Sequence, residues 1–69
     1  MIFTNSDAEF IKDNFDNYNE LLNASHVNDV LDAIGDLIDN KGFAPPEYYD
    51  YNDFGRKAQR VYDSIYENN

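Results

Sequence analysis

Apolar residues recur every three or four positions along the first 40 residues, the spacing of one face of an α-helix. This spacing predicts a helix over residues 7–22, begun by a capping box from Ser6 to Glu9 in which each side chain bonds the other's backbone amide. Asn residues crowd between positions 14 and 19 and have low helix propensity, so the segment could instead form two short helices. The apolar face of this region consists of Phe10, Ile11, Phe15, Tyr18, Leu21 and Leu22.

The next region gives the strongest helical pattern in the chain. Its apolar positions are Val27, Val30, Leu31, Ile34, Leu37 and Ile38. Ser25 is the expected N-cap, and Gly42 is the expected glycine that terminates the helix. Gly35 lies inside this helix, where it costs about 1 kcal/mol relative to Ala. Its presence suggests that a neighbouring segment packs closely there.

A proline pair separates this region from the last helix. Pro45 and Pro46 cannot continue a helix, so the segment from Tyr48 to Tyr51 is expected to be an extended loop or one short strand. Asn52 then caps a final helix whose apolar face consists of Phe54, Ala58, Val61, Tyr62 and Ile65. The sequence therefore predicts a single all-α domain over residues 1–69. It is a small bundle of three helices, or four if the first one divides, with a Pro-Pro-Tyr loop before the last.

Charge is the most informative global property. The chain has 14 acids and 5 bases, a formal net charge of −9. Such a protein repels nucleic acid and anionic lipid, because binding phosphates requires Lys and Arg. No apolar run approaches the roughly 18 residues that span a bilayer. The first ten residues lack the basic region and apolar stretch of a secretory signal, and the chain has no cysteine, so we expect a cytoplasmic protein.

Catalytic and metal-binding patterns are weak. The single histidine, His26, adjoins Ser25, but adjacent side chains on a helix do not face each other, so a nucleophile–base pair is not expected. The stretch starting at Asp50 matches some positions of a calcium-binding EF-hand loop, but Val61 stands where the bidentate Glu is required. We therefore expect a non-enzymatic protein without metal or cofactor.

The acids form two rows opposite the apolar faces. The first row, within about 60° of helix surface, is Glu9, Asp13, Asp16 and Glu20. The second, within about 80°, is Asp29, Asp32, Asp36 and Asp39. Steps of about 4.5–6 Å along each row are of the same order as phosphate spacing in a nucleic-acid strand.

A charged face opposite a core can simply be solvated surface. An ordinary helix, however, mixes acids and bases, whereas these eight acids share their helices with Lys12 and Lys41 alone. Like charges at these spacings cost a few tenths of a kcal/mol each, roughly, which favours a function for the acidic surface.

From residue 54 onward, the last helix has more bases than acids, the opposite of the rest of the chain. Residues 1–53 contain 12 acids and 2 bases, whereas residues 54–69 contain 2 acids and 3 bases. We expect Arg56 and Lys57 to tie this helix to the acidic ones, with Asp53 and Lys57 forming a local pair.

One short motif resembles a known family. The pattern Tyr48-x-Asp50-Tyr51-x-x-Phe54-Gly55-Arg56 is similar to a segment near the carboxyl end of ArdA-type antirestriction proteins. Those acidic proteins of mobile elements imitate DNA and occupy restriction enzymes. In style the chain also resembles small acidic proteins encoded by phages, many of which inhibit host defence systems. The resemblance implies a DNA-mimic inhibitor in the cytoplasm of a bacterial host.

Together these features predict a partner-binding surface. The row Asp29, Asp32, Asp36 and Asp39 would supply the electrostatic field, and a second group of residues would supply contacts: Glu47, Tyr48, Tyr49 and Asp50. The expected partner is a basic nucleic-acid-binding protein, such as a nuclease of a restriction or CRISPR system. We also expect Tyr49 or Tyr51 to pack beneath the proline pair as part of the core.

Two alternatives remain open. The protein could be a small phage-type adaptor or regulator that docks through an apolar surface, its acids serving only solubility. The segment from Tyr48 onward also looks like the end of a winged-helix domain, but the acidic second helix makes DNA binding the third choice. The sequence leaves a homodimer open.

Overall fold

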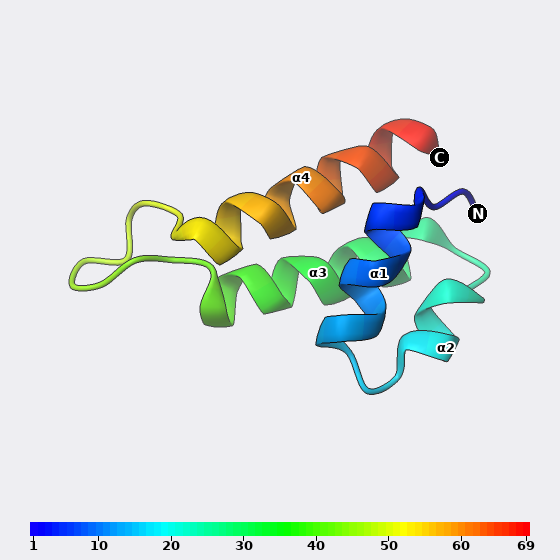
Figure 1. Cartoon of the computed structure of the whole chain (residues 1–69), viewed down its shortest axis with the longest axis horizontal. Helices are drawn as coiled ribbons and strands as arrows, with labels where there is room; N and C mark the ends of the chain where they lie inside the picture. Colours follow the sequence, from blue (N-terminus) through cyan, green and yellow to red (C-terminus); the bar gives the residue numbers. More distant parts are fainter.

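The structure is an all-α bundle, as predicted. The computed structural model describes all 69 residues and contains four helices and no strand. These are α1 (Asn5–Asn14), α2 (Tyr18–Leu22), α3 (Val27–Lys41) and α4 (Asp53–Asn68). Helices α3 and α4 lie antiparallel and form the long axis of a 37 × 24 × 19 Å molecule, with α1 and α2 packed at one end (Figure 1). The loop between α3 and α4 projects from the other end.

The core lies where α1, α3 and α4 meet. The apolar spacing of each helix puts one face inside, and ten hydrophobic side chains are buried. They are Phe10, Ile11, Leu21, Val30, Leu31, Ile34, Ile38, Ala58, Val61 and Ile65. The rings of Phe10 in α1 and Phe54 in α4 lie 5.8 Å apart between centroids. All ten belong to the apolar faces that the sequence predicts.

The predicted helix over 7–22 is divided into α1 and α2. The side-chain amide of Asn14 donates to the carbonyl oxygen of Phe10 at 2.8 Å, and Phe15 is extended with φ −130° and ψ 126°. Asn side chains compete in this way for backbone groups that would otherwise continue a helix. Leu21, in α2, belongs to the core, and Phe15, at the break, packs against it.

The first helix is capped by Thr4 instead of Ser6. The hydroxyl of Thr4 accepts a 3.1 Å hydrogen bond from the amide of Asp7, and Ser6 lies exposed within the helix. The predicted capping box with Glu9 is therefore wrong. Asp7 occupies the third helical position, and its carboxylate accepts a 2.7 Å bond from the Ser64 hydroxyl in α4.

Helix α3 begins one residue later than expected. His26, not Ser25, is its N-cap, and its exposed side chain makes no capping hydrogen bond. Gly35 has open space on its outer side, because a Cβ built there would meet no atom within 4 Å. The expectation of a closely packed neighbour at Gly35 is therefore wrong.

A close contact between two glycines closes the helical hairpin. Gly42 ends α3 as predicted, in a right-handed conformation with φ −93° and ψ −1°. A Cβ on Gly55 would lie 2.8 Å from the carbonyl carbon and 2.9 Å from the Cα of Gly42. The two glycines let the backbones of α3 and α4 approach at this point.

Asn52 fastens the same junction with hydrogen bonds. Its side-chain oxygen accepts from the Gly55 amide at 2.7 Å, as predicted for the N-cap of α4. Its side-chain amide donates to the carbonyl oxygen of Lys41 at 2.7 Å, and its backbone amide donates to that of Gly42 at 2.8 Å. One residue thereby joins the end of α3 to the start of α4.

The segment of residues 43–51, the tyrosine loop, is an ordered loop with a single β-bridge. The rings of Phe43 and Tyr51 stack at 5.2 Å, and the Ala44 amide donates to the Asp50 carbonyl at 2.8 Å. Tyr48 has a positive φ of 62°, which is uncommon for a bulky residue. Loops held at both sides of their base present their tips in a defined position.

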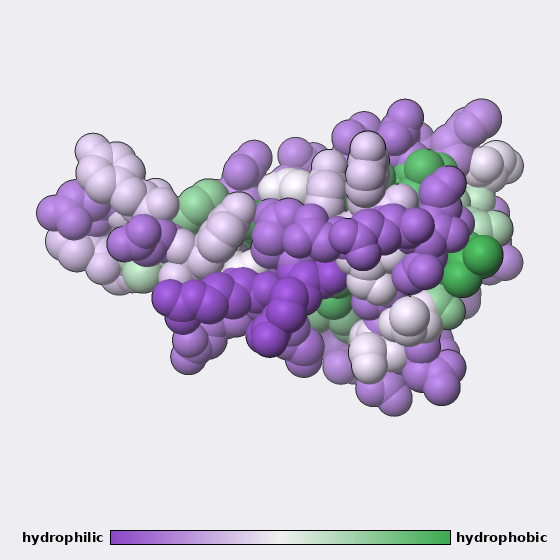
Figure 2. Space-filling view, turned by 90° about the horizontal axis from the view of Figure 1, so that it is seen from above, coloured by the Kyte–Doolittle hydropathy of each residue, from purple (hydrophilic) through white to green (hydrophobic).

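The two ends of the chain meet at the end of the molecule away from the tyrosine loop (Figure 1). The Ile2 amide donates to the side-chain oxygen of Asn69 at 2.8 Å, and the Asn69 side-chain amide donates back to the Ile2 carbonyl at 2.9 Å. Seen from the α4 side, the molecule is largely hydrophilic, with small hydrophobic patches at the end where the termini lie (Figure 2). No helix combines the length and apolar character needed to cross a membrane.

Candidate functional site

The predicted acidic row lies along one exposed face of α3. The apolar positions of this helix turn inward, which leaves Asp29, Asp32, Asp36 and Asp39 exposed. None of the four forms an ion pair, because the molecule contains only the one between Arg56 and Asp53. The sequence therefore predicts both the exposure of this row and its single sign of charge.

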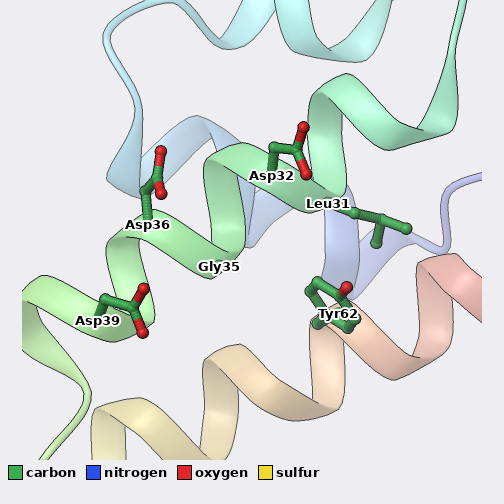
Figure 3. A pocket seen from close by; sticks show the side chains of 6 residues that line it. All are labelled: Leu31, Asp32, Gly35, Asp36, Asp39 and Tyr62. Carbon is green, nitrogen blue, oxygen red and sulfur yellow. The ribbon is translucent and has the colours of Figure 1, made fainter.

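Three of these acids border an open hollow between α3 and α4. This acidic hollow has a volume of about 370 Å³ and is lined by Leu31, Asp32, Gly35, Asp36, Asp39 and Tyr62 (Figure 3). The missing side chain of Gly35 leaves the space open between successive turns of α3. Tyr62, from α4, forms the facing wall, and Asp29 lies outside the hollow.

The acidic hollow has the chemistry of a site for an organic cation. Carboxylates form charge-assisted hydrogen bonds with guanidinium and ammonium groups, and a tyrosine ring adds cation–π attraction. No group of three or more His, Cys, Asp or Glu side chains is arranged to hold a metal ion. The hollow therefore suits an Arg or Lys side chain of a partner better than a bare cation.

The first acidic row is not continuous. Glu9 and Asp13 lie on α1, but Asp16 falls in the turn after it and Glu20 lies on the separate helix α2. The break at Phe15 therefore removes the straight row that the sequence predicts. All four acids remain exposed.

The other predicted contacts gather at the tip of the tyrosine loop. Glu47, Tyr48, Tyr49 and Asp50 are all exposed, and they lie beyond the C-terminal end of α3 and outside the acidic hollow. Tyr49 is 85% exposed and Tyr48 is 60% exposed, so neither belongs to the core. Tyr51 is the tyrosine that packs at the loop base, against Phe43, but it too lies outside the core.

The basic residues do not tie α4 to the acidic helices. Arg56 pairs with Asp53 at 3.1 Å within the first turn of α4, in place of the predicted pair with Lys57. Lys57 and Arg60 form no ion pair. The acids of α1–α3 therefore stay unneutralised.

Three residues of the acidic hollow are not predicted as site residues, and one of them, Leu31, is a core residue of α3. Leu31 and Tyr62 are expected only as parts of apolar faces, and Gly35 only as a packing position. The signal for Gly35 is its place between Asp32 and Asp36 on a helix that otherwise favours larger residues. Nothing in the sequence places Tyr62 opposite them, because that depends on the register of α3 against α4.

Comparison with protein-family models, curated proteins and solved structures finds no match for this chain. The resemblance to ArdA-type proteins therefore rests on the nine-residue pattern from Tyr48 to Arg56 alone.

Proposed function

We propose that this protein is a non-enzymatic DNA mimic that occupies the nucleic-acid-binding site of a host or defence enzyme of the restriction or CRISPR type. The observation that supports the proposal best is the unpaired row on α3, three of whose acids border an open hollow. Solvated surfaces normally mix charges and form local pairs. Here the acids face solvent without partners.

The geometry supports a defined mode of binding. Asp32, Asp36 and Asp39 follow one another at about 4.5–6 Å along the helix axis, by the rise of an α-helix. A protein groove that holds a phosphate strand neutralises the phosphates with Arg and Lys side chains. One such side chain would enter the acidic hollow, and its neighbours would pair with the acids on either side.

The tyrosine loop supplies the second contact. Tyrosine offers a large contact area at low entropic cost and is enriched at interface hot spots. Tyr48 and Tyr49 project beside Glu47 and Asp50, so an Arg-rich surface could meet rings and carboxylates together. Electrostatic steering would make association fast and sensitive to salt.

The first test is capture of the target. Tagged protein incubated with bacterial lysate at low salt should retain a nucleic-acid-binding enzyme, which added duplex DNA or high salt should release. The purified target then allows the decisive comparison of variants.

That comparison uses two double variants with the same change in charge. Asp32→Lys/Asp36→Lys reverses the α3 row, and Glu9→Lys/Asp13→Lys reverses two exposed acids on α1. The α3 variant should weaken target binding at least about tenfold, or about 1.4 kcal/mol, and the α1 variant much less. Equal losses would mean that net charge alone matters, and no loss in either would reject mimicry.

A second candidate function is an adaptor that docks through the tyrosine loop. The exposure of Tyr48 and Tyr49 favours it, because large exposed aromatic side chains mark interaction surfaces. This reading predicts a partner that remains bound at high salt and is not displaced by added DNA. Tyr49→Ala should abolish its binding, and Asp32→Lys/Asp36→Lys should leave the binding intact.

A further inference from the structure

A second hollow lies at the base of the tyrosine loop. This basic hollow has a volume of about 320 Å³ and is lined by Tyr51, Arg56, Gln59 and Arg60. It shares no residue with the acidic hollow. Three of its four residues belong to residues 54–69, the one part of the chain in which bases outnumber acids.

Hydrogen bonds hold two walls of the basic hollow in place. The Tyr51 hydroxyl donates to the side-chain oxygen of Gln59 at 3.1 Å, and the Gln59 amide donates to Asp63 at 2.9 Å. The ring of Tyr51 stacks on Phe43. Because these polar groups satisfy one another, the ring and the amide form a fixed wall.

The two arginines retain free donors. Arg56 uses one terminal nitrogen to bond Asp53 at 3.1 Å, and Arg60 forms no ion pair or side-chain hydrogen bond. A guanidinium group has five N–H donors in a planar fork that matches carboxylate and phosphate oxygens. Residues four apart on a helix are neighbours on its surface, so both guanidinium groups can reach one anion.

Nearby charges favour a small anion over a large one. Besides Arg56 and Arg60, the charged neighbours of the basic hollow are Lys57 and three acids. Asp50 precedes Tyr51 in the sequence, and Asp53 and Asp63 accept from Arg56 and Gln59. At physiological ionic strength charges are screened over about 8 Å, so the acids of α1–α3 act weakly on an anion held here. A long polyanion would also meet those acids and be repelled.

We infer that the basic hollow binds a small oxyanion joined to a flat ring, of the aryl phosphate or aryl carboxylate class. Arg56 and Arg60 would hold the anionic oxygens, and the ring would lie against Tyr51 and the aliphatic part of the arginine side chains. The volume lies at the lower end of the range for small-molecule sites, roughly 300–1,000 Å³. This site is independent of target binding by α3.

The test is an NMR titration of the ¹⁵N-labelled protein at constant ionic strength, in which phenyl phosphate replaces chloride. Inorganic phosphate and benzoate serve as parallel ligands. We expect saturable shifts for the amides of Tyr51, Arg56 and Arg60 and for the side-chain amide of Gln59. Phenyl phosphate or benzoate should bind more tightly than inorganic phosphate, and the better of the two identifies the anion.

Two neighbouring cations of α4 provide the matched variants. Arg60→Gln should weaken binding at least tenfold, whereas Lys57→Gln, the same change in charge outside the hollow, should leave it within twofold. Arg60→Lys should give an intermediate loss, because it keeps the charge without the planar fork. Unsaturable shifts with both phenyl phosphate and benzoate, or equal losses in Arg60→Gln and Lys57→Gln, would overturn the inference.

Discussion

The carboxylate of Asp7 in α1 accepts a 2.7 Å hydrogen bond from the hydroxyl of Ser64 in α4, across 57 residues of sequence. Asp7 is only 3% exposed and is the one buried charged residue. It lies in the first turn of α1, where the helix dipole favours an anion. The pair therefore fixes α1 against α4 by a polar contact inside a largely apolar interface.

Removing one partner of this pair should be costly. Ser64→Ala leaves a buried carboxylate without its hydrogen bond, and we expect the free energy of unfolding to fall by about 1–3 kcal/mol. Urea denaturation measures the loss. Ser6→Ala, an exposed serine in the same turn as Asp7, is the control and should change stability by less than about 0.5 kcal/mol.

A double variant shows whether the two side chains act together. If the bond is a unit, Asp7→Ala/Ser64→Ala should cost less than the sum of the single losses, with a coupling of about 0.5–3 kcal/mol. Strict additivity would show that each residue acts separately.

The glycines should respond in opposite directions to the same substitution. Gly35→Ala should stabilise the protein by up to about 1 kcal/mol, because alanine favours the helix and its Cβ meets nothing within 4 Å. Gly55→Ala should destabilise it by about 1–3 kcal/mol or more, because the Cβ would collide with the Gly42 backbone. Thermal unfolding by circular dichroism separates the two, and a stable Gly55→Ala would contradict the close contact.

Asn52 should contribute more to folding stability than an ordinary helix cap. Asn52→Ala removes the cap to the Gly55 amide, worth about 0.5–2 kcal/mol, and also the bond to the Lys41 carbonyl. Asn52→Asp keeps the cap and loses the side-chain amide that donates to the Lys41 carbonyl and, at 3.5 Å, to the Phe43 carbonyl. We expect Asp to be intermediate in denaturation experiments. If Asp matches the native residue, the link to α3 contributes nothing.

Alanine substitutions at two tyrosines of the loop should affect different properties, target binding at Tyr49 and folding stability at Tyr51. Tyr49→Ala should change stability by less than about 0.5 kcal/mol, because the side chain is 85% exposed. Tyr51→Ala loses the stack on Phe43 and should cost about 0.5–1.5 kcal/mol. With a target in hand, Tyr49→Ala should weaken binding while the fold stays intact, and unchanged binding would remove Tyr49 from the interface.

Helix periodicity predicts most of this fold, because burying apolar faces decides which residues lie inside. It does not predict the ends of α1, because hydrogen bonds between the backbone and the side chains of Thr4 and Asn14 decide where this helix begins and ends. Nor does it predict the pairing of Asp7 with Ser64, since a contact 57 residues apart depends on how the helices pack.

The candidate site, like the fold, can be predicted from the sequence only in part. The exposure of the α3 acids follows from their position opposite a core face, so the sequence predicts it. The hollow itself needs Tyr62 from α4 to stand opposite Gly35, and the basic hollow needs Tyr51 to fold back on α4. Both depend on the junction of Gly42 with Gly55, which no pattern of hydrophobic residues encodes.

The hydrogen bonds between Ile2 and Asn69 place both attachment points for a tag or label at one end of the molecule. A label, a surface linkage or a fused protein attached at either end of the chain would leave from the same place, at the opposite end from the tyrosine loop (Figure 1). Molecules immobilised through either terminus would therefore share one orientation, with the tyrosine loop facing away from the surface and accessible to a partner in solution.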